Sequence, residues 1–95
     1  MANLNQCDYA ALIDGYNESE RLARSYKPVP YANPHPWGSR LHRIFEFGYY
    51  VQEKGLILGA RDYWQTGRGG TFHSPAGQTY KLWCDKTGLG IQRIA

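Results

Sequence analysis

The chain has 95 residues, a hydrophobic fraction of 42% and a net charge of +3, which suits one small domain and excludes a disordered chain. No apolar run approaches the ~18 residues of a membrane span, and the N-terminus lacks the pattern of a signal peptide. We therefore expect a cytoplasmic protein with no membrane partner, in which Cys7 and Cys84 are free thiols.

The first predicted element is a helix that begins after Asn5 and ends near Tyr26. Asn5 is a favourable N-cap residue, and Asp8 follows three residues later, as in a capping box. Apolar side chains then recur at helical spacing, at Tyr9, Leu12, Ile13 and Tyr16. This spacing predicts one buried face.

A second helix is predicted beyond a connector, residues 27–36, that contains too much proline for regular structure. This helix should begin at about Pro36 or Ser39 and end at Glu53, with Gly55 as its C-terminal stop. Its apolar stripe is predicted at Trp37, Leu41, Ile44, Phe45 and Gly48. The two helices should form a hairpin-like pair, with close approach at the glycine.

The pattern changes after Gly55. Residues 56–64 are compatible with a strand or a short helix, and residues 65–70 with a loop. Short strands separated by turn sequences are predicted near Phe72 and over residues 78–84 and 89–94. We expect one α+β domain over residues 1–95, with a helical part (1–54) packed on an antiparallel sheet of three or four strands (55–95).

The predicted strand over residues 78–84 has two distinct faces. Tyr80, Leu82 and Cys84 share one face, whereas Thr79, Lys81 and Trp83 share the other. One face should pack on the helices, and we expect Trp83 to be partly exposed.

No catalytic, metal or cofactor motif is evident. The histidines and cysteines lack metal-ligand spacing, and no nucleophile stands with a base. The glycine-rich segment at residues 66–70 lacks the Lys-Ser/Thr ending of a P-loop, although Arg68 within it is a candidate contact residue. We expect a protein that is not an enzyme and that needs no cofactor.

Basic residues are concentrated between residues 21 and 45, where no acidic residue occurs. Arg40, His42 and Arg43 should face away from the apolar stripe, and an antiparallel helix pair would bring Arg21 and Arg24 near Arg40. Such cations beside aromatics suit RNA phosphates and bases, and protein interfaces are enriched in the same residue types. The predicted contact residues are Arg21, Arg24, Lys27, Tyr31, Arg40, His42, Arg43 and Arg68.

Part of this pattern is similar to a known family. The matching pieces are Gly15-Tyr16, Pro30-Tyr31, the turn Asn33-Pro34-x-Pro36-x-Gly38-Ser39, and Arg40 followed by Phe45 and Gly48-Tyr49. Through them, residues 15–50 resemble the ribosome modulation factor/CrpP-like family of very small bacterial and phage proteins. The resemblance implies two helices joined by a proline-containing connector and, because the ribosome modulation factor binds ribosomal RNA, RNA contact by Arg40 and Arg43.

Two functions remain as hypotheses. The first is a small non-enzymatic regulator that binds RNA or a ribonucleoprotein. The alternative is a phage or mobile-element inhibitor, for example of the anti-CRISPR type, that binds a host protein complex directly. The sequence leaves the partner and the oligomeric state open.

Overall fold

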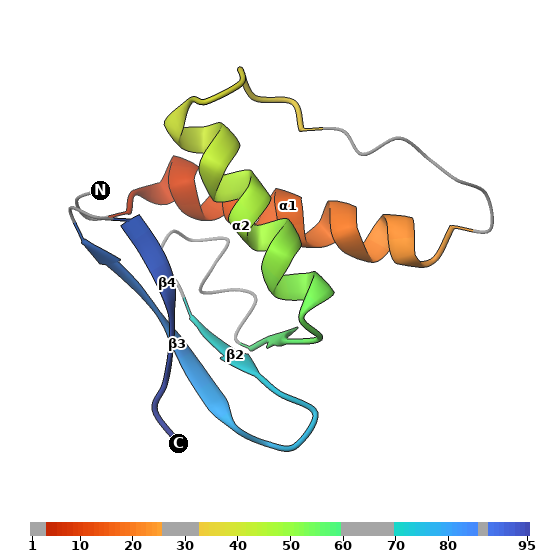
Figure 1. Ribbon diagram of the computed structural model, residues 1–95, viewed down its shortest axis with the longest axis vertical. Coiled ribbons are helices and arrows are strands. Elements are labelled where there is room, and N and C mark those ends of the chain that lie inside the picture. The colour runs from red at the N-terminus through yellow and green to blue at the C-terminus, as the bar shows by residue number, and fades with distance from the viewer. Residues whose placement is uncertain (1–3, 26–32, 60–69, 86–87) are drawn as a thin grey trace.

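The computed structural model describes residues 4–25, 33–59, 70–85 and 88–95, without the side chains of Cys84 and Asp85. Within these residues lie two helices and four strands: α1 (Gln6–Ala23), α2 (Arg40–Glu53), β1 (Ile57–Leu58), β2 (Thr71–His73), β3 (Thr79–Asp85) and β4 (Gly88–Arg93) (Figure 1). The strands form one antiparallel sheet in the order β1-β2-β3-β4, and the helices pack against it. The predicted α+β architecture is therefore confirmed.

Helix α1 begins with the predicted capping box. The Asn5 side chain accepts a hydrogen bond of 2.9 Å from the Asp8 backbone N–H, and the Asp8 carboxylate accepts one of 2.9 Å from the Asn5 N–H. The helix ends at Ala23, where the Ser25 N–H bonds to the carbonyl of Leu22 and tightens the last turn. The predicted end was therefore too late, and Tyr26 lies outside the described residues.

Helix α2 begins at the later of its two predicted starts. Ser39 is the N-cap, and its hydroxyl accepts a hydrogen bond of 3.2 Å from the His42 N–H. The helix ends at Glu53, and Gly55 beyond it has a φ of 82°, as expected for a glycine that stops a helix. Both predicted ends are thus confirmed, since each is set by a local capping residue.

The two helices run in the same general direction, so the predicted antiparallel hairpin is wrong (Figure 1). Asp8 and Arg40 pair at their first turns, and Ser19 and Gln52 hydrogen bond at their last turns. The start of α2 therefore lies beside the start of α1 and not beside its end, as a short hairpin loop would require.

The helices cross closely at two glycines, as predicted for Gly48. A Cβ atom at Gly48 would overlap the carbonyl oxygen of Leu12, and one at Gly15 would overlap the carbonyl oxygen of Phe45. The absence of side chains at both positions lets the two backbones touch.

The core joins the helices to the sheet. Buried side chains of both helices meet those of β1 and β2, namely Ala11, Leu12, Ile13, Tyr16, Ile44, Val51, Leu56, Leu58 and Phe72. The Tyr16 hydroxyl donates to the Leu56 carbonyl at 2.8 Å and accepts from the Leu58 N–H at 3.3 Å. Residues 57–58 are therefore strand, while residues 60–64 of the ambiguous segment lie outside the described residues.

Candidate binding surfaces

A rigid turn precedes α2 and displays a tryptophan. The Asn33 side chain accepts a hydrogen bond of 3.0 Å from the His35 N–H, and the Pro36 carbonyl accepts one of 3.1 Å from the Ser39 N–H. Gly38 has a φ of 77°. These features describe a type II β-turn with Trp37 at its first central position.

Trp37 is 90% exposed, so the prediction that it belongs to the buried stripe is wrong. It matches the helical spacing in sequence, but the helix starts only at Arg40, and the turn directs the indole away from the core. One neighbour of the indole is the imidazole of His42, with the two ring centroids 4.8 Å apart.

His42 does not face solvent as predicted, because the residues before α2 fold back over it. Its side chain is 8% exposed. The Asn33 amide donates to the His42 carbonyl at 3.0 Å and to Glu46 at 3.2 Å, and Nε2 of His42 lies 3.4 Å from Glu46. His42 therefore supports the turn that carries Trp37.

Arg40 also has a role within the fold. Its Nε and Nη2 atoms donate to the two carboxylate oxygens of Asp8 at 3.1 and 2.8 Å, and Asp8 is 1% exposed. Burial raises the pKa of Asp8, but hydrogen bonds from Arg40 and the Asn5 N–H, with the charge of Arg40, bring it below its ordinary value. The arginine thereby keeps a buried carboxylate ionised.

The other predicted contact residues do not gather into one basic surface. Arg21 and Arg24 lie at the end of α1 that is remote from Arg40, and they pair with Glu18 and Glu20. Three further predicted residues, Lys27, Tyr31 and Arg68, lie outside the described residues.

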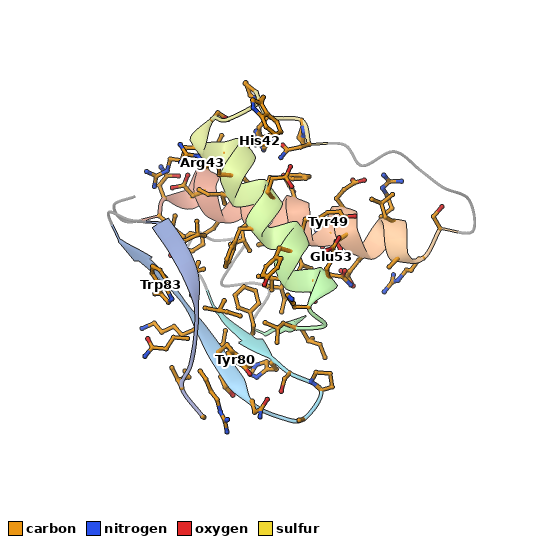
Figure 2. The ribbon with its side chains drawn as sticks, viewed as in Figure 1. His42, Arg43, Tyr49, Glu53, Tyr80 and Trp83 are labelled. Carbon is orange, nitrogen blue, oxygen red and sulfur yellow. The ribbon has the colours of Figure 1, made fainter. Side chains whose placement is uncertain are left out.

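Arg43 is exposed like Arg21 and Arg24, but unlike them it has no ion pair with another described residue (Figure 2). It lies in the first turn of α2, which contains no acidic residue. The positive helix terminus and the guanidinium group therefore add at this end of α2.

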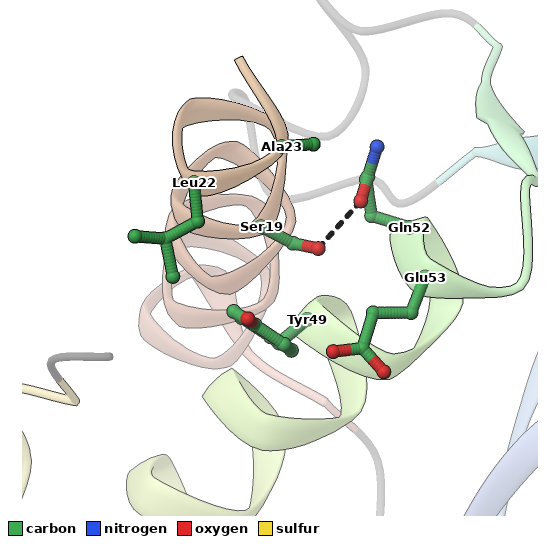
Figure 3. A pocket seen from close by; sticks show the side chains of 6 residues that line it. All are labelled: Ser19, Leu22, Ala23, Tyr49, Gln52 and Glu53. Atoms are coloured by element: carbon green, nitrogen blue, oxygen red, sulfur yellow. Dashed lines mark hydrogen bonds between the residues drawn. The ribbon is translucent and has the colours of Figure 1, made fainter. Parts of the chain in front are cut away.

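A separate open groove lies between the C-terminal ends of the helices (Figure 3). It has a volume of about 610 Å³ and is lined by Ser19, Leu22, Ala23, Tyr49, Gln52 and Glu53. Burial and the charges of Glu53 and Glu18 raise the pKa of Tyr49. The hydroxyl of Ser19 donates to an amide oxygen of Gln52, which cannot act as a general base, so Gln52 does not activate this hydroxyl.

The sequence hypotheses did not include the outer face of the sheet as a site. On this face, Trp83 is 41% exposed, as predicted (Figure 2). The strand register places Lys81 and its partner Gln92 on the same face, one row away. The side-chain alternation over residues 79–83 placed Trp83 and Lys81 on the same face of the strand, and this was the sequence signal that pointed to the surface. The pairing with β4, which completes the surface, could not be derived from it.

No group of three histidine, cysteine or acidic side chains within the described residues is placed to hold a metal ion. Among the same residues, no helix has the length and hydrophobicity needed to span a bilayer. Comparisons with protein-family models, curated proteins and solved structures found no match. The function is therefore argued from the surfaces themselves.

Proposed function

We propose that this protein is a small non-enzymatic regulator that binds a protein partner, alone or within a ribonucleoprotein, through the turn that carries Trp37. The observation that carries the proposal is the exposure of the indole, 90%, on a turn fixed by two local hydrogen bonds. The resemblance of residues 15–50 to the ribosome modulation factor family supports a ribonucleoprotein as the larger assembly.

A preorganised tryptophan is well suited to protein recognition. Tryptophan and arginine are enriched among the residues that dominate binding energy at protein interfaces, and a fixed conformation reduces the entropy lost on binding. The turn holds Trp37 in place before any partner arrives, and Arg43 lies nearby in the chain to meet an acidic group at the edge of the partner's pocket.

The pairing of arginines with acidic residues in this chain favours a protein over naked RNA as the partner. Arg21, Arg24 and Arg40 each have an acidic partner within the chain. Their positive charge is therefore largely compensated locally, which weakens the electrostatic attraction on which RNA affinity depends.

The experiment is a capture assay from bacterial lysate with immobilised protein, with and without nuclease, comparing the wild type with Trp37→Ala. We expect a protein partner that survives nuclease and whose affinity falls by roughly 30-fold or more in Trp37→Ala, the ~2 kcal/mol typical of a dominant interface residue. Trp83→Ala is the matched control, because it removes a tryptophan from another face and should retain the partner after nuclease. Equal capture by wild type and Trp37→Ala would refute the proposal.

Direct RNA binding at the same end of α2 is the second candidate, and exposed Arg43 beside a helix N-terminus favours it. In that case nuclease should abolish capture, and RNA affinity should fall steeply with salt and further in Arg43→Ala.

A further inference from the structure

The outer face of the sheet carries the indole ring of Trp83 next to several polar side chains. The strand register places Ile57, His73 and Thr79 in one row, Thr71, Lys81 and Gln92 in the next, and Trp83 opposite Gly90 beyond them. The opposite face carries Phe72, Tyr80, Leu82 and Ile91, which pack on the core. Figure 2 shows Trp83 on the side of the sheet away from the helices.

Trp83 lies across its cross-strand partner. Three atoms of the indole, Cζ2, Cε2 and Nε1, lie 2.7, 2.8 and 2.9 Å from the place that a Cβ atom of Gly90 would occupy. Gly90 therefore provides the space in which the ring rests on β4, and a side chain at this position would displace it. The ring is supported by backbone on one side while 41% of the residue stays accessible.

The surroundings of Trp83 are polar and include a lysine. Lys81 is exposed, lies two residues before Trp83 on the same face, about 7 Å along the strand, and has no ion-pair partner among the described residues. The alternation of β3 makes Asp85 the next residue on this face beyond Trp83, although its side chain is not among those described. Thr71, Thr79 and Gln92 add hydrogen-bonding groups next to the lysine.

We propose that this face binds single-stranded nucleic acid, with the Trp83 indole stacked on one base and Lys81 on a neighbouring phosphate. A supported aromatic ring and a nearby cation are what an unpaired, negatively charged strand requires. A duplex keeps its bases stacked and offers none to the indole. The site is distinct from the Trp37 turn, and does not depend on the function proposed for that turn.

The test measures binding of short labelled single-stranded RNA and DNA by fluorescence anisotropy at several salt concentrations, with a duplex of equal length for comparison. Trp83→Ala should weaken single-strand binding at least about fivefold, whereas Trp83→Phe should retain most of it because it can still stack. Tyr50→Ala, which removes an exposed aromatic ring from α2, should bind as the wild type does.

Lys81→Gln gives a second readout that cannot be confused with unfolding, because the side chain is exposed. It should reduce the slope of log affinity against log salt by about 0.7, the value for one lost contact to a single strand. Equal binding by wild type and Trp83→Ala, an equal loss in Tyr50→Ala, an unchanged salt slope in Lys81→Gln, or no wild-type binding at low salt would each overturn the proposal.

Discussion

Arg40 is expected to act as a structural residue, and the substitution Arg40→Met tests this. Methionine keeps a long apolar stem but removes both hydrogen bonds to the Asp8 carboxylate. Asp8 is 1% exposed, so its negative charge would stay buried and would keep the hydrogen bond from the Asn5 N–H.

The magnitude follows from the geometry of the pair. Loss of one partner of a fully buried ion pair costs about 3–5 kcal/mol, whereas a fully exposed pair contributes about 0–1 kcal/mol. The side chain of Arg40 is 40% exposed, which places this pair between the two limits. We expect the free energy of unfolding to fall by about 2 kcal/mol, which lowers Tm by roughly 8–16 °C in a domain of this size.

The assay is urea unfolding followed by far-ultraviolet circular dichroism, with Arg43→Met as the matched control. Arg43 lies three residues further along the same helix and is exposed, so its replacement should change stability by less than about 0.5 kcal/mol. The reasoning fails if Arg40→Met loses no more stability than Arg43→Met.

The same pair predicts a dependence on pH. Because the folded-state pKa of Asp8 lies below its ordinary value of 3.8, the pair stabilises the protein above pH 3.8 and loses that effect as pH falls through the folded-state value. The difference between wild type and Arg40→Met should therefore be largest near neutral pH and shrink in acid. A difference that stays constant into strong acid would contradict the assignment.

The helix crossing and the open groove give two further predictions. Alanine usually stabilises a helix relative to glycine by about 0.5–1 kcal/mol. Gly48→Ala should nevertheless destabilise this protein by about 1–3 kcal/mol, because the added Cβ atom would overlap the Leu12 carbonyl. A rise in Tm would contradict this prediction. Burial, followed by the charges of Glu53 and Glu18, raises the pKa of Tyr49 above the ordinary tyrosine value of 10. In an ultraviolet titration of phenol ionisation, Tyr49→Phe should therefore remove one transition that lies above pH 10. The Tyr49 phenol ionises at lower pH in the unfolded chain than in the folded protein, so the wild type should lose more stability above pH 10 than Tyr49→Phe does. If the transition that Tyr49→Phe removes from the titration lies at or below pH 10, the assignment is refuted.

The elements that could be predicted from sequence are those set by neighbours in the chain. Asn5 and Ser39 cap their helices with side chains that reach only three residues, and Gly55 stops a helix through its own backbone conformation. The alternation in β3 likewise gives the two faces of the strand. Each of these signals acts over a few residues, so no tertiary information was needed.

The direction of the helix pair could not be predicted, because it depends on contacts between distant residues. Asp8 and Arg40 are 32 positions apart, and nothing in the sequence shows that they meet. In the folded protein, the negative charge of Asp8 in the first helix neutralises the positive charge of Arg40 in the basic segment. The segregation of charge in the sequence was therefore a poor guide to the charge of the folded surface.

Trp37 was misplaced for a different reason. Helical spacing was counted from a residue that precedes the N-cap, where the periodicity no longer has a structural meaning. The sequence Pro36-Trp37-Gly38-Ser39 contained the correcting signal, since glycine at the third position of a turn before a serine cap favours a type II turn.

The Tyr16 hydroxyl has a consequence for how the chain folds. Its two partners, the Leu56 carbonyl and the Leu58 N–H, lie 40 and 42 positions later in the sequence. A fragment ending at α2 would lose both of these partners within its core, so the segment that carries the family resemblance should not fold autonomously. Because its N–H is bound to the Tyr16 hydroxyl, the amide proton of Leu58 should exchange with solvent more slowly than that of exposed Ile57, and Tyr16→Phe should remove this protection.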